Sequence, residues 1–500
     1  NNNSGTSYGN TATTGDIIGV AMDLENSKLY FSKNNTWQNS GDPTSGATGT
    51  GAASITAGET YAFGVSDGSA SHSTTTIVNF GADSSFAGNV TAQGNQDGND
   101  KGDFYYEPPT DYLALCSDNL PSPEIALPGE NFNTIIWSGA QSGASAPDRS
   151  FTGVGFQPDF VWSKSRSNAN QHNLQNSVAT LGDSLNSDAT AVAGDTKGSG
   201  YLSSLDSDGF TSTAGASGVI NWDESGRTYV AWNWKAGGAP TADNSAGAGA
   251  TPTAGSVKID GSNLGSALAG SIAATRLSAN TTAGFSIVKF QNNATSGATV
   301  AHGLGVTPEL IITKMIDGTY SWYTYCKYMD ATAPEDYYME LNEAGGKADS
   351  ATDGWNDTLP TSSVFSLGDG GSNSLGSKNV IAYCFTSIEG YSKVGSYEGN
   401  GNVDGTFIYC GFKPACIIVK DADTSARNWF IFDNKRSSYN VVDDKLYPNL
   451  SIAETTPADA YDFISNGLKV RSTDANWNTS GDSYIYIAFA ESPFKTSNAR

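Results

Sequence analysis

The protein has 500 residues, with 27 Lys and Arg against 51 Asp and Glu, so its net charge at pH 7 is −24. This charge excludes surfaces for nucleic acid or anionic membranes, because both need concentrated positive charge. No apolar run reaches the roughly 18 residues of a membrane span, so we expect no membrane insertion. A hydrophobic content of 38% excludes a disordered acidic chain.

Strand signals dominate the whole chain. Short alternating runs rich in Val, Ile, Tyr, Phe and Trp are separated by clusters of Gly, Asn, Asp and Ser, which is typical of antiparallel sandwiches. We predict an all-β fold of tandem β-sandwich domains with little helix. The best helix candidate is the Ala-rich stretch 264–277, which Gly265 and Gly270 weaken.

Residues 1–106 differ from the remainder of the chain. The run Gly15-Asp16-Ile17-Ile18-Gly19 leads into Lys28–Asn34, and further apolar runs follow at 61–65 and 77–81. Between Gly15 and Phe86 this pattern resembles the C-terminal part of a SPRY domain. The resemblance implies a concanavalin A-like sandwich whose first half is missing, and we expect the chain to begin inside a longer protein.

Three later segments share a turn, a strand and a closing strand. Each has a Gly-x-x-Pro turn before a strand that ends in lysine, and an alanine in the closing strand follows at a near-constant distance. The prolines are Pro158, Pro308 and Pro414, the lysines are Lys164, Lys314 and Lys420, and the alanines are Ala231, Ala382 and Ala488. Such an internal repeat predicts three copies of one sandwich.

We place these copies at 131–238, 283–388 and 389–494 and refer to them as repeats 1, 2 and 3. Residues 107–130 are a predicted linker, 239–282 are a Gly/Ala/Ser/Thr-rich connector and 495–500 a tail. A connector of this composition is flexible or extended. We therefore expect repeats 2 and 3, which abut directly, to form a semi-rigid pair, while repeat 1 moves relative to them.

The repeated lysines allow two interpretations. By strand alternation, each shares a face with the apolar residues before it, for example Lys164 with Phe160 and Trp162. The interpretation that we prefer is structural: the stem extends the apolar row and the ammonium group reaches water at the strand end. A functional role is the alternative.

We predict that the protein is not an enzyme. The three histidines, His72, His172 and His302, share no metal-ligand spacing, and no nucleophile elbow is present. His172 occupies a position that is aromatic in the other repeats. The acidic run Glu335–Glu340 has the wrong spacing for paired glycosidase carboxylates. Five cysteines without a CxxC pair predict buried free thiols and folding in a reducing cytoplasm.

Calcium is the one cofactor for which the sequence offers candidate ligands. Asp97, Asp100 and Asp103 lie in a loop rich in Gly and Asn, and hard cations bind several oxygen atoms. The alternative is that these residues are there because turns require them.

Carbohydrate binding is the function that we favour for the free surface. Lectin-type sites combine an aromatic ring with polar hydrogen-bonding groups. The candidates are Trp355 with Asn356 and Asp357, Tyr439 with Asn440, and Trp477 with Asn476 and Asn478. The alternative is that these rings cap the ends of the sandwich cores.

Several segments resemble tailed-bacteriophage virion proteins. These are the junction Tyr106–Cys116, the stretches 153–166 and 229–235, and the runs 301–308 and 389–393. The resemblance implies a tail fibre that is made in the bacterial cytoplasm, functions in the extracellular virion and attaches to the host. Its expected partners are other virion proteins and a host glycan or protein receptor, and trimers are usual in such appendages. A non-receptor structural appendage or capsid-decorating protein is the first alternative, and a polysaccharide depolymerase tailspike the second.

Overall fold

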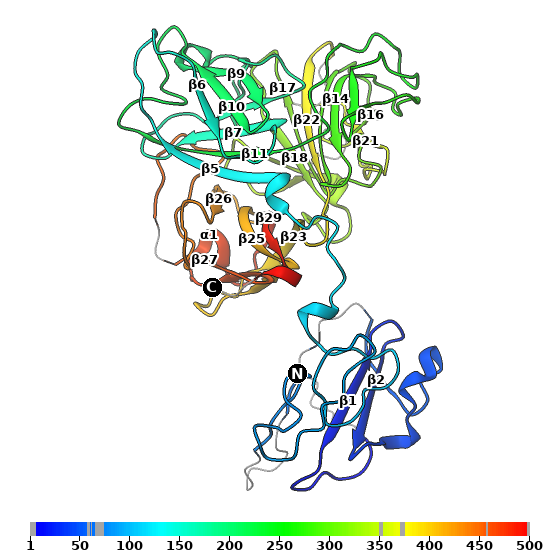
Figure 1. The fold of residues 1–500 in the computed structure, drawn as a ribbon. Helices are drawn as coiled ribbons and strands as arrows, with labels where there is room; N and C mark the ends of the chain where they lie inside the picture. The colour runs from blue at the N-terminus through cyan, green and yellow to red at the C-terminus, as the bar shows by residue number, and fades with distance from the viewer. Residues whose placement is uncertain are drawn as a thin grey trace. The chain divides into compact units, whose positions relative to one another are not determined.

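We describe the protein from a computed structural model over residues 7–57, 61, 63–65, 75–349, 354–370, 376–456 and 459–497. Figure 1 shows that strands are the main regular elements of the chain, which confirms the all-β prediction. Over these ranges the only α-helix is α1 (Ala475–Asn478), and none of the helices is long and apolar enough to cross a membrane. The 3-10 segments are η1 (Gln38–Ser40), η2 (Pro43–Thr48), η3 (Ser117–Asn119), η4 (Pro128–Glu130), η5 (Lys197–Ser199), η6 (Pro334–Asp336) and η7 (Phe494–Thr496).

The chain forms two compact units, Asn1–Pro121 and Ser122–Arg500. The first unit carries a small antiparallel sheet. Its strands β1 (Ile18–Asp23) and β2 (Lys28–Lys33) form a hairpin, and β3 (Thr36–Trp37) and β4 (Ala53–Ser54) both pair with β2. Asp23 orders the turn because its carboxylate accepts hydrogen bonds from the backbone and side chain of Asn26.

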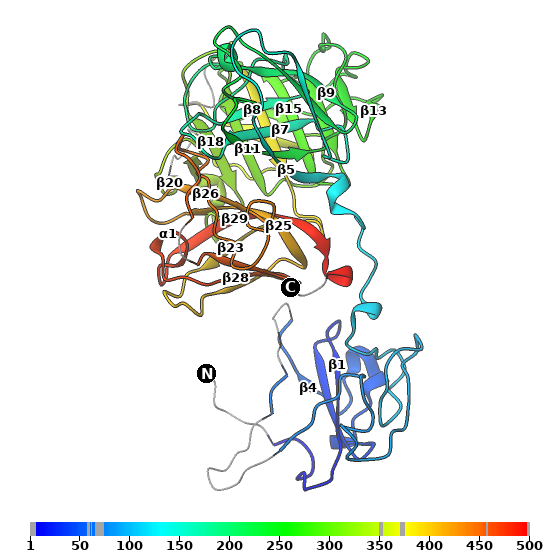
Figure 2. The same ribbon diagram turned by 60° about the vertical axis from the view of Figure 1, so that its left-hand side comes forward.

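The second unit contains the three repeats, and each has a larger antiparallel sheet with the same strand order (Figure 2). The order is opening strand, closing strand, the strand after the turn, and then the next strand along the chain. In repeat 1 these strands are β5 (Phe132–Ser138), β11 (Thr228–Trp234), β7 (Phe160–Ser165) and β8 (Asn173–Asn176). In repeat 2 they are β15 (Phe285–Gln291), β22 (Asn379–Phe385), β17 (Leu310–Met315) and β18 (Trp322–Cys326). In repeat 3 they are β23 (Ser392–Glu398), β29 (Ser483–Pro493), β25 (Phe412–Asp421) and β26 (Trp429–Asp433).

A smaller sheet completes each sandwich. In repeat 1 it consists of β6 (Arg149–Thr152), β10 (Gly209–Thr213) and β9 (Tyr201–Asp206). In repeat 2 it consists of β16 (Ala298–Ala301) and β21 (Val364–Leu367), while β19 (Tyr337–Glu340) and β20 (Ala348–Asp349) extend the larger sheet. In repeat 3 it consists of β24 (Phe407–Tyr409), β28 (Gly467–Val470) and β27 (Tyr461–Ile464).

The connector between repeats 1 and 2 is part of the second repeat's sheet. Strand β14 (Ala274–Asn280) pairs antiparallel with β15, and β12 (Val257–Ile259) and β13 (Ser262–Asn263) follow at the sheet edge. The expectation of a flexible linker is therefore wrong, and the weak helix candidate 264–277 is not a helix. Leu277 and Ala279 are buried in the core of repeat 2, and this burial and pairing outweigh the helix propensity of the alanines, which Gly265 and Gly270 already oppose.

The repeat is less regular in repeat 3 than the sequence spacing predicts. Ala231 pairs with Ser163, and Ala382 pairs with Thr313. Ser163 and Thr313 each lie five residues after the turn proline of their repeat. In repeat 3 the register of β25 shifts on both sides of Pro414. These two shifts cancel, and Ala488 pairs with Ile417, two residues before the equivalent position Val419.

The larger sheets of all three repeats pack their inner faces against one common core. Successive residues of each larger sheet alternate between this common core and the core of their own sandwich. Trp162 and Trp232 face the common core, whereas the adjacent residues Val161 and Ala231 face the smaller sheet. Repeats 2 and 3 show the same division. The prediction that repeat 1 moves relative to the other two is therefore wrong, because its largest side chains are buried against theirs.

Backbone hydrogen bonds join the repeats head to tail into a ring. In each repeat the carbonyl two residues after the repeated lysine accepts an N–H from a loop of another repeat. The bonds are Ala193 N to Ile316 O (3.0 Å), Lys347 N to Ala422 O (2.7 Å) and Glu454 N to Arg166 O (2.7 Å). They link repeat 1 to 2, repeat 2 to 3, and repeat 3 back to 1, so the three equivalent interfaces close on themselves.

His172 of repeat 1 occupies the position that is Trp322 in repeat 2 and Trp429 in repeat 3. All three side chains lie at these same interfaces. Trp322 Nε1 donates to Asn186 O (2.9 Å), and Trp429 Nε1 donates to Glu340 O (3.1 Å). His172 Nδ1 accepts from Trp162 Nε1 (2.9 Å), so its Nε2 carries the proton and donates to Tyr447 O (2.9 Å). Burial holds the pKa of His172 well below its ordinary value, which keeps the imidazole neutral in this role.

Candidate functional site

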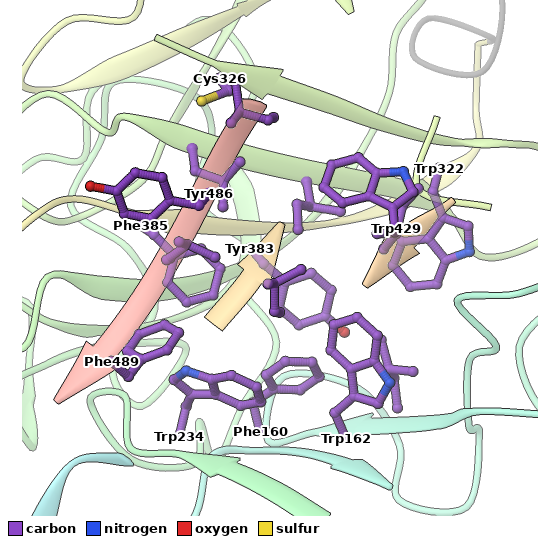
Figure 3. A pocket seen from close by; sticks show the side chains of 17 residues that line it. Phe160, Trp162, Trp234, Trp322, Cys326, Tyr383, Phe385, Trp429, Tyr486 and Phe489 are labelled. Carbon is purple, nitrogen blue, oxygen red and sulfur yellow. The ribbon is translucent and has the colours of Figure 1, made fainter. Parts of the chain in front are cut away.

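An apolar cavity lies where the three repeats meet (Figure 3). It is a cavity of about 30 Å³, and its lining of side chains such as Phe160, Trp234, Tyr383 and Phe489 is almost wholly apolar. An apolar space of this size remains dry or holds at most about one water molecule. It is therefore a packing feature of the common core and does not supply the polar groups of a ligand site.

Two of the rings proposed for sugar binding are buried. Trp355 belongs to the core of repeat 2, where its ring meets that of Tyr325 at 5.8 Å. Trp477 belongs to the core of repeat 3 and packs edge-on against Phe430 and Phe432. Since neither face is open to solvent, these two predictions are wrong, and the alternative that the rings fill the sandwich cores is correct.

The polar neighbours of these tryptophans support local backbone structure. Asn478 is buried and donates to Asn402 O and Ser472 O. Asn476 pairs with the carboxylate of Asp474. Asn356 and Asp357 lie in the left-handed backbone region, and Asn356 accepts a hydrogen bond from Ser296. The tryptophan rings beside these four residues are buried, so the four do not form the sugar-stacking sites that the sequence predicted.

Both members of the third predicted pair are exposed. The Tyr439 side chain is 81% exposed. Asn440 instead extends a sheet, because its side-chain amide donates to Phe463 O (2.9 Å) and accepts from Phe463 N (2.9 Å). Of the predicted glycan residues, Tyr439 alone remains available as a ring on the surface.

The predicted calcium ligands do not converge. Asp97 is surrounded by donors: its carboxylate accepts from the backbone of Asn99, Lys101 and Ala114 and from the side chain of Asn119, at 2.7–3.0 Å. Desolvation opposes ionisation, but these bonds together lower the pKa of Asp97 to about 2. Asp100 is exposed, and Asp103 Oδ1 is buried without a partner. Over the residues described, no three His, Cys, Asp or Glu side chains gather in a metal-binding group.

The three repeated lysines are completely buried, so the prediction that their ammonium groups reach water is wrong. Lys164 Nζ donates to Ser165 O (2.7 Å) and Lys420 Nζ to Asp421 O (2.6 Å). Lys314 Nζ donates to Tyr320 O (2.5 Å) and, across the interface with repeat 1, to Thr190 O (3.0 Å). Desolvation lowers the pKa of each lysine to about 8.

His302 is held by hydrogen bonds to the backbone, and four of the five cysteines are buried. His302 Nδ1 accepts from Leu304 N (3.2 Å), and its Nε2 lies 3.1 Å from Thr361 O; His72 lies outside the described residues. Cys326, Cys384, Cys410 and Cys416 are buried free thiols, as predicted, whereas Cys116 is exposed. Burial raises the pKa of the Cys326 thiol to about 12, so it remains an unreactive thiol.

The strongest candidate site is the outer face of the smaller sheet in repeat 3. Its edge strand β24 turns Ile408 into the core and exposes the two flanking rings: Phe407 is 45% and Tyr409 60% exposed. Gly467 pairs with Tyr409 on the next strand. A side chain at this glycine would collide with the Ile408 carbonyl, so the space beside the Tyr409 ring is kept open.

The other two repeats have no such rings at the equivalent positions. On β6 the residues that flank the inward Phe151 are Ser150 and Thr152. On β16 the inward Val300 is flanked by Thr299 and Ala301. The fold therefore does not require aromatic residues on this strand. The rings of repeat 3 are a local addition, which we call the aromatic face: Phe407, Tyr409 and the outward residues of β27 and β28 beside them.

Paired charges form the polar part of the aromatic face. Lys469 lies opposite both Phe407 and Asp462, and its Nζ contacts Asp404 Oδ1 at 2.8 Å. Arg471 Nε lies 3.4 Å from Asp462 Oδ2. The Lys469 ammonium group lowers the pKa of Asp404. These pairs supply hydrogen-bond donors and acceptors with little net charge, which suits the hydroxyl groups of an uncharged sugar.

The sequence reasoning missed Phe407 and Tyr409, although a signal was present. In Phe407-Ile408-Tyr409-Cys410 apolar residues occupy both faces of a short strand. A half-buried antiparallel strand normally alternates apolar and polar residues. An aromatic residue where the alternation requires a polar one marks a ring that points to solvent.

Comparison with known proteins identifies the family but not its activity. No curated protein and no solved structure matches this chain. The model of a family described as "Domain of unknown function (DUF7483)" matches residues 127–259 and 257–493, which span all three repeats and the connector. The chain therefore belongs to the DUF7483 family.

Proposed function

We propose that this protein is a bacteriophage virion protein of the tail-fibre type that attaches to the host surface by binding glycan on the aromatic face of repeat 3. The observation that carries the binding proposal is the exposed pair Phe407 and Tyr409, where the sister repeats have small residues. Aromatic rings beside hydrogen-bonding groups are the usual recognition elements for sugar rings.

Two further features support this proposal. The sequence segments that resemble tailed-phage virion proteins cover much of the chain. The closed ring of repeats also gives the aromatic face a rigid support, because β24 belongs to a sandwich whose larger sheet is fixed in the common core. A preformed surface loses little conformational entropy when a ligand binds.

Binding to host cells and to a glycan array tests the proposal. The test variants are Phe407→Ala and Tyr409→Ala, and the matched control is Thr152→Ala on the equivalent strand of repeat 1. We expect each test variant to weaken binding by roughly tenfold, given the energy of a stacked aromatic contact, while the control binds as the parent does. Binding that is unchanged in Phe407→Ala and Tyr409→Ala would contradict the proposal.

The main alternative is a structural appendage without a receptor of its own. The observation in its favour is the closed arrangement of the three repeats, in which three sandwiches share one core within one compact unit. This alternative predicts no binding to any host cell or glycan. A depolymerase would instead release new reducing ends from host polysaccharide, so the same samples distinguish the three functions.

A further inference from the structure

The sheet that carries the aromatic face is one strand wider than β24, β28 and β27 alone. A segment near Val442 pairs with the free edge of β27: Val442 N donates to Tyr461 O (2.7 Å), and Asn440 exchanges two hydrogen bonds with Phe463. Val442 and Tyr461 are both buried in the core of repeat 3. The surface therefore continues from β24, across β28 and β27, to the segment 440–442.

A hollow lies on this extended surface. Its lining consists of Val403, Asp404, Val441, Asp459 and Arg471. Two of these residues also belong to the charge pairs of the aromatic face, Asp404 with Lys469 and Arg471 with Asp462. The hollow and the rings of β24 are therefore connected by the same polar side chains, and the highly exposed Tyr439 lies two residues before Val441.

The distance across this surface exceeds one sugar ring. From β24 to the segment 440–442 there are three strand spacings, which is roughly 14 Å. Apolar or aromatic groups lie at both ends, with Phe407 and Tyr409 on one side and Val441 on the other, where the exposed Tyr439 precedes Val441 by two residues. Between them are ion pairs that expose no large excess of either charge.

We propose that the aromatic face and the hollow together bind a linear, uncharged oligosaccharide that lies across the strands. One sugar stacks on Phe407 and Tyr409, the next ones hydrogen-bond to Lys469, Asp462 and Arg471, and a distal sugar lies over the hollow beside Val441 and Tyr439. This inference rests on the proposed function and adds to it the length and charge of the ligand.

The test uses the full chain and fragments of one, two and four sugar units, prepared from the host polysaccharide that the parent protein binds. We expect the four-unit fragment to bind roughly tenfold more tightly than the single sugar, because a second stacked contact adds about 1.4 kcal/mol. Tyr439→Ala should reduce the affinity for the four-unit fragment and leave that for the single sugar unchanged. Tyr409→Ala should reduce both affinities.

The control is Leu359→Ala, which removes an apolar side chain that is 50% exposed in repeat 2 and should change neither affinity. Equal affinities for all fragment lengths, or no effect of Tyr439→Ala on the four-unit fragment, would overturn this inference while leaving glycan binding at Tyr409 intact. Binding that requires an acidic sugar and weakens steeply with salt would also overturn it. If no fragment and no intact polysaccharide binds, the proposed function itself fails.

Discussion

Lys164, Lys314 and Lys420 are buried ammonium groups at equivalent positions of three sandwiches. Burying a charge is costly unless it is hydrogen-bonded, and each of these groups donates to at least one backbone carbonyl. Lys314 also bonds to Thr190 of repeat 1. The repeated lysine therefore marks the end of each larger sheet where the repeats meet, which gives its recurrence a structural explanation.

The lysines give the protein a testable pH dependence. Because burial lowers the pKa of Lys314 to about 8, the unfolded chain binds one more proton than the folded chain between pH 8 and roughly 10.4. Lys314 therefore raises stability as the pH rises through this window. We expect the free energy of unfolding of the parent, relative to Lys314→Met, to increase by roughly 2 kcal/mol between pH 8 and 10 in urea titrations.

Buried tyrosines and cysteines also make stability depend on pH in this window, because they ionise there in the unfolded chain. They are common to the parent and the variant and cancel in this difference. The control is Lys327→Met, which removes the same charge from a half-exposed site paired with Glu309. A difference between parent and Lys314→Met that does not change with pH would show that the Lys314 ammonium group is hydrated.

A substitution of Trp477 tests whether this residue stabilises the core or binds glycan. Its indole is buried between Phe430 and Phe432, and Lys445 Nζ lies 4.9 Å from the ring centroid. We expect Trp477→Ala to lower the free energy of unfolding by about 3–5 kcal/mol through the cavity that it leaves. Folded Trp477→Ala, examined below its unfolding transition, should bind glycan as the parent does; a stable variant that has lost binding would restore Trp477 as a contact residue.

Among the structural elements, the interface between repeats 3 and 1 is distinctive because no chain connection joins them. Glu454 of repeat 3 bridges Arg166 of repeat 1 (2.7 Å) and the buried Arg436 (2.9 Å). Desolvation favours the neutral acid, but the two guanidinium groups hold the pKa of Glu454 below its usual value. The ring is thus closed by a partly buried ion-pair network.

Glu454→Gln should weaken this closure. We expect it to lower the free energy of unfolding by about 3 kcal/mol, because it leaves two guanidinium groups without their shared carboxylate. Asp118→Asn is the comparison, since it breaks the exposed pair with Lys101 and should cost less than about 1 kcal/mol. Equal costs for the two substitutions in urea titrations would mean that Glu454 does not close the ring.

The sequence predicted strands better than it predicted how they pack. The spacing of prolines and lysines located the central strands of all three larger sheets, because turn chemistry and alternation are local properties. The common core was not predictable. The sequence pattern indicates that Trp162 and Ile312 are buried, but it does not indicate which other repeat they pack against. The connector was misjudged because β14 becomes a strand only through its pairing with β15. At the site, alternation could have identified Tyr409 as exposed, but it could not show that Trp477 is buried, because Trp477 lies in α1 and not in a strand.

At the scale of the whole molecule, the shared core predicts cooperativity among the repeats. Trp162 of repeat 1 lines the same cavity as Ile312 of repeat 2 and Ile418 of repeat 3. We expect Trp162→Ala to lower the unfolding temperature of all three repeats together, as measured by hydrogen exchange on heating, and to leave the transition of the unit Asn1–Pro121 unchanged. Loss of structure in repeat 1 alone would show that the repeats are independent domains. Homotrimer formation stays a prediction that mass measurement in solution tests.

Glycan recognition on repeat 3 is tested most directly by hydrogen exchange of the full chain with and without its host polysaccharide. The proposed function predicts slower exchange in β24 and β28, around Phe407, Tyr409 and Lys469, and unchanged exchange in the equivalent strands β6 and β16. Protection confined to repeats 1 and 2 or to the first unit, with β24 and β28 unchanged, would contradict it.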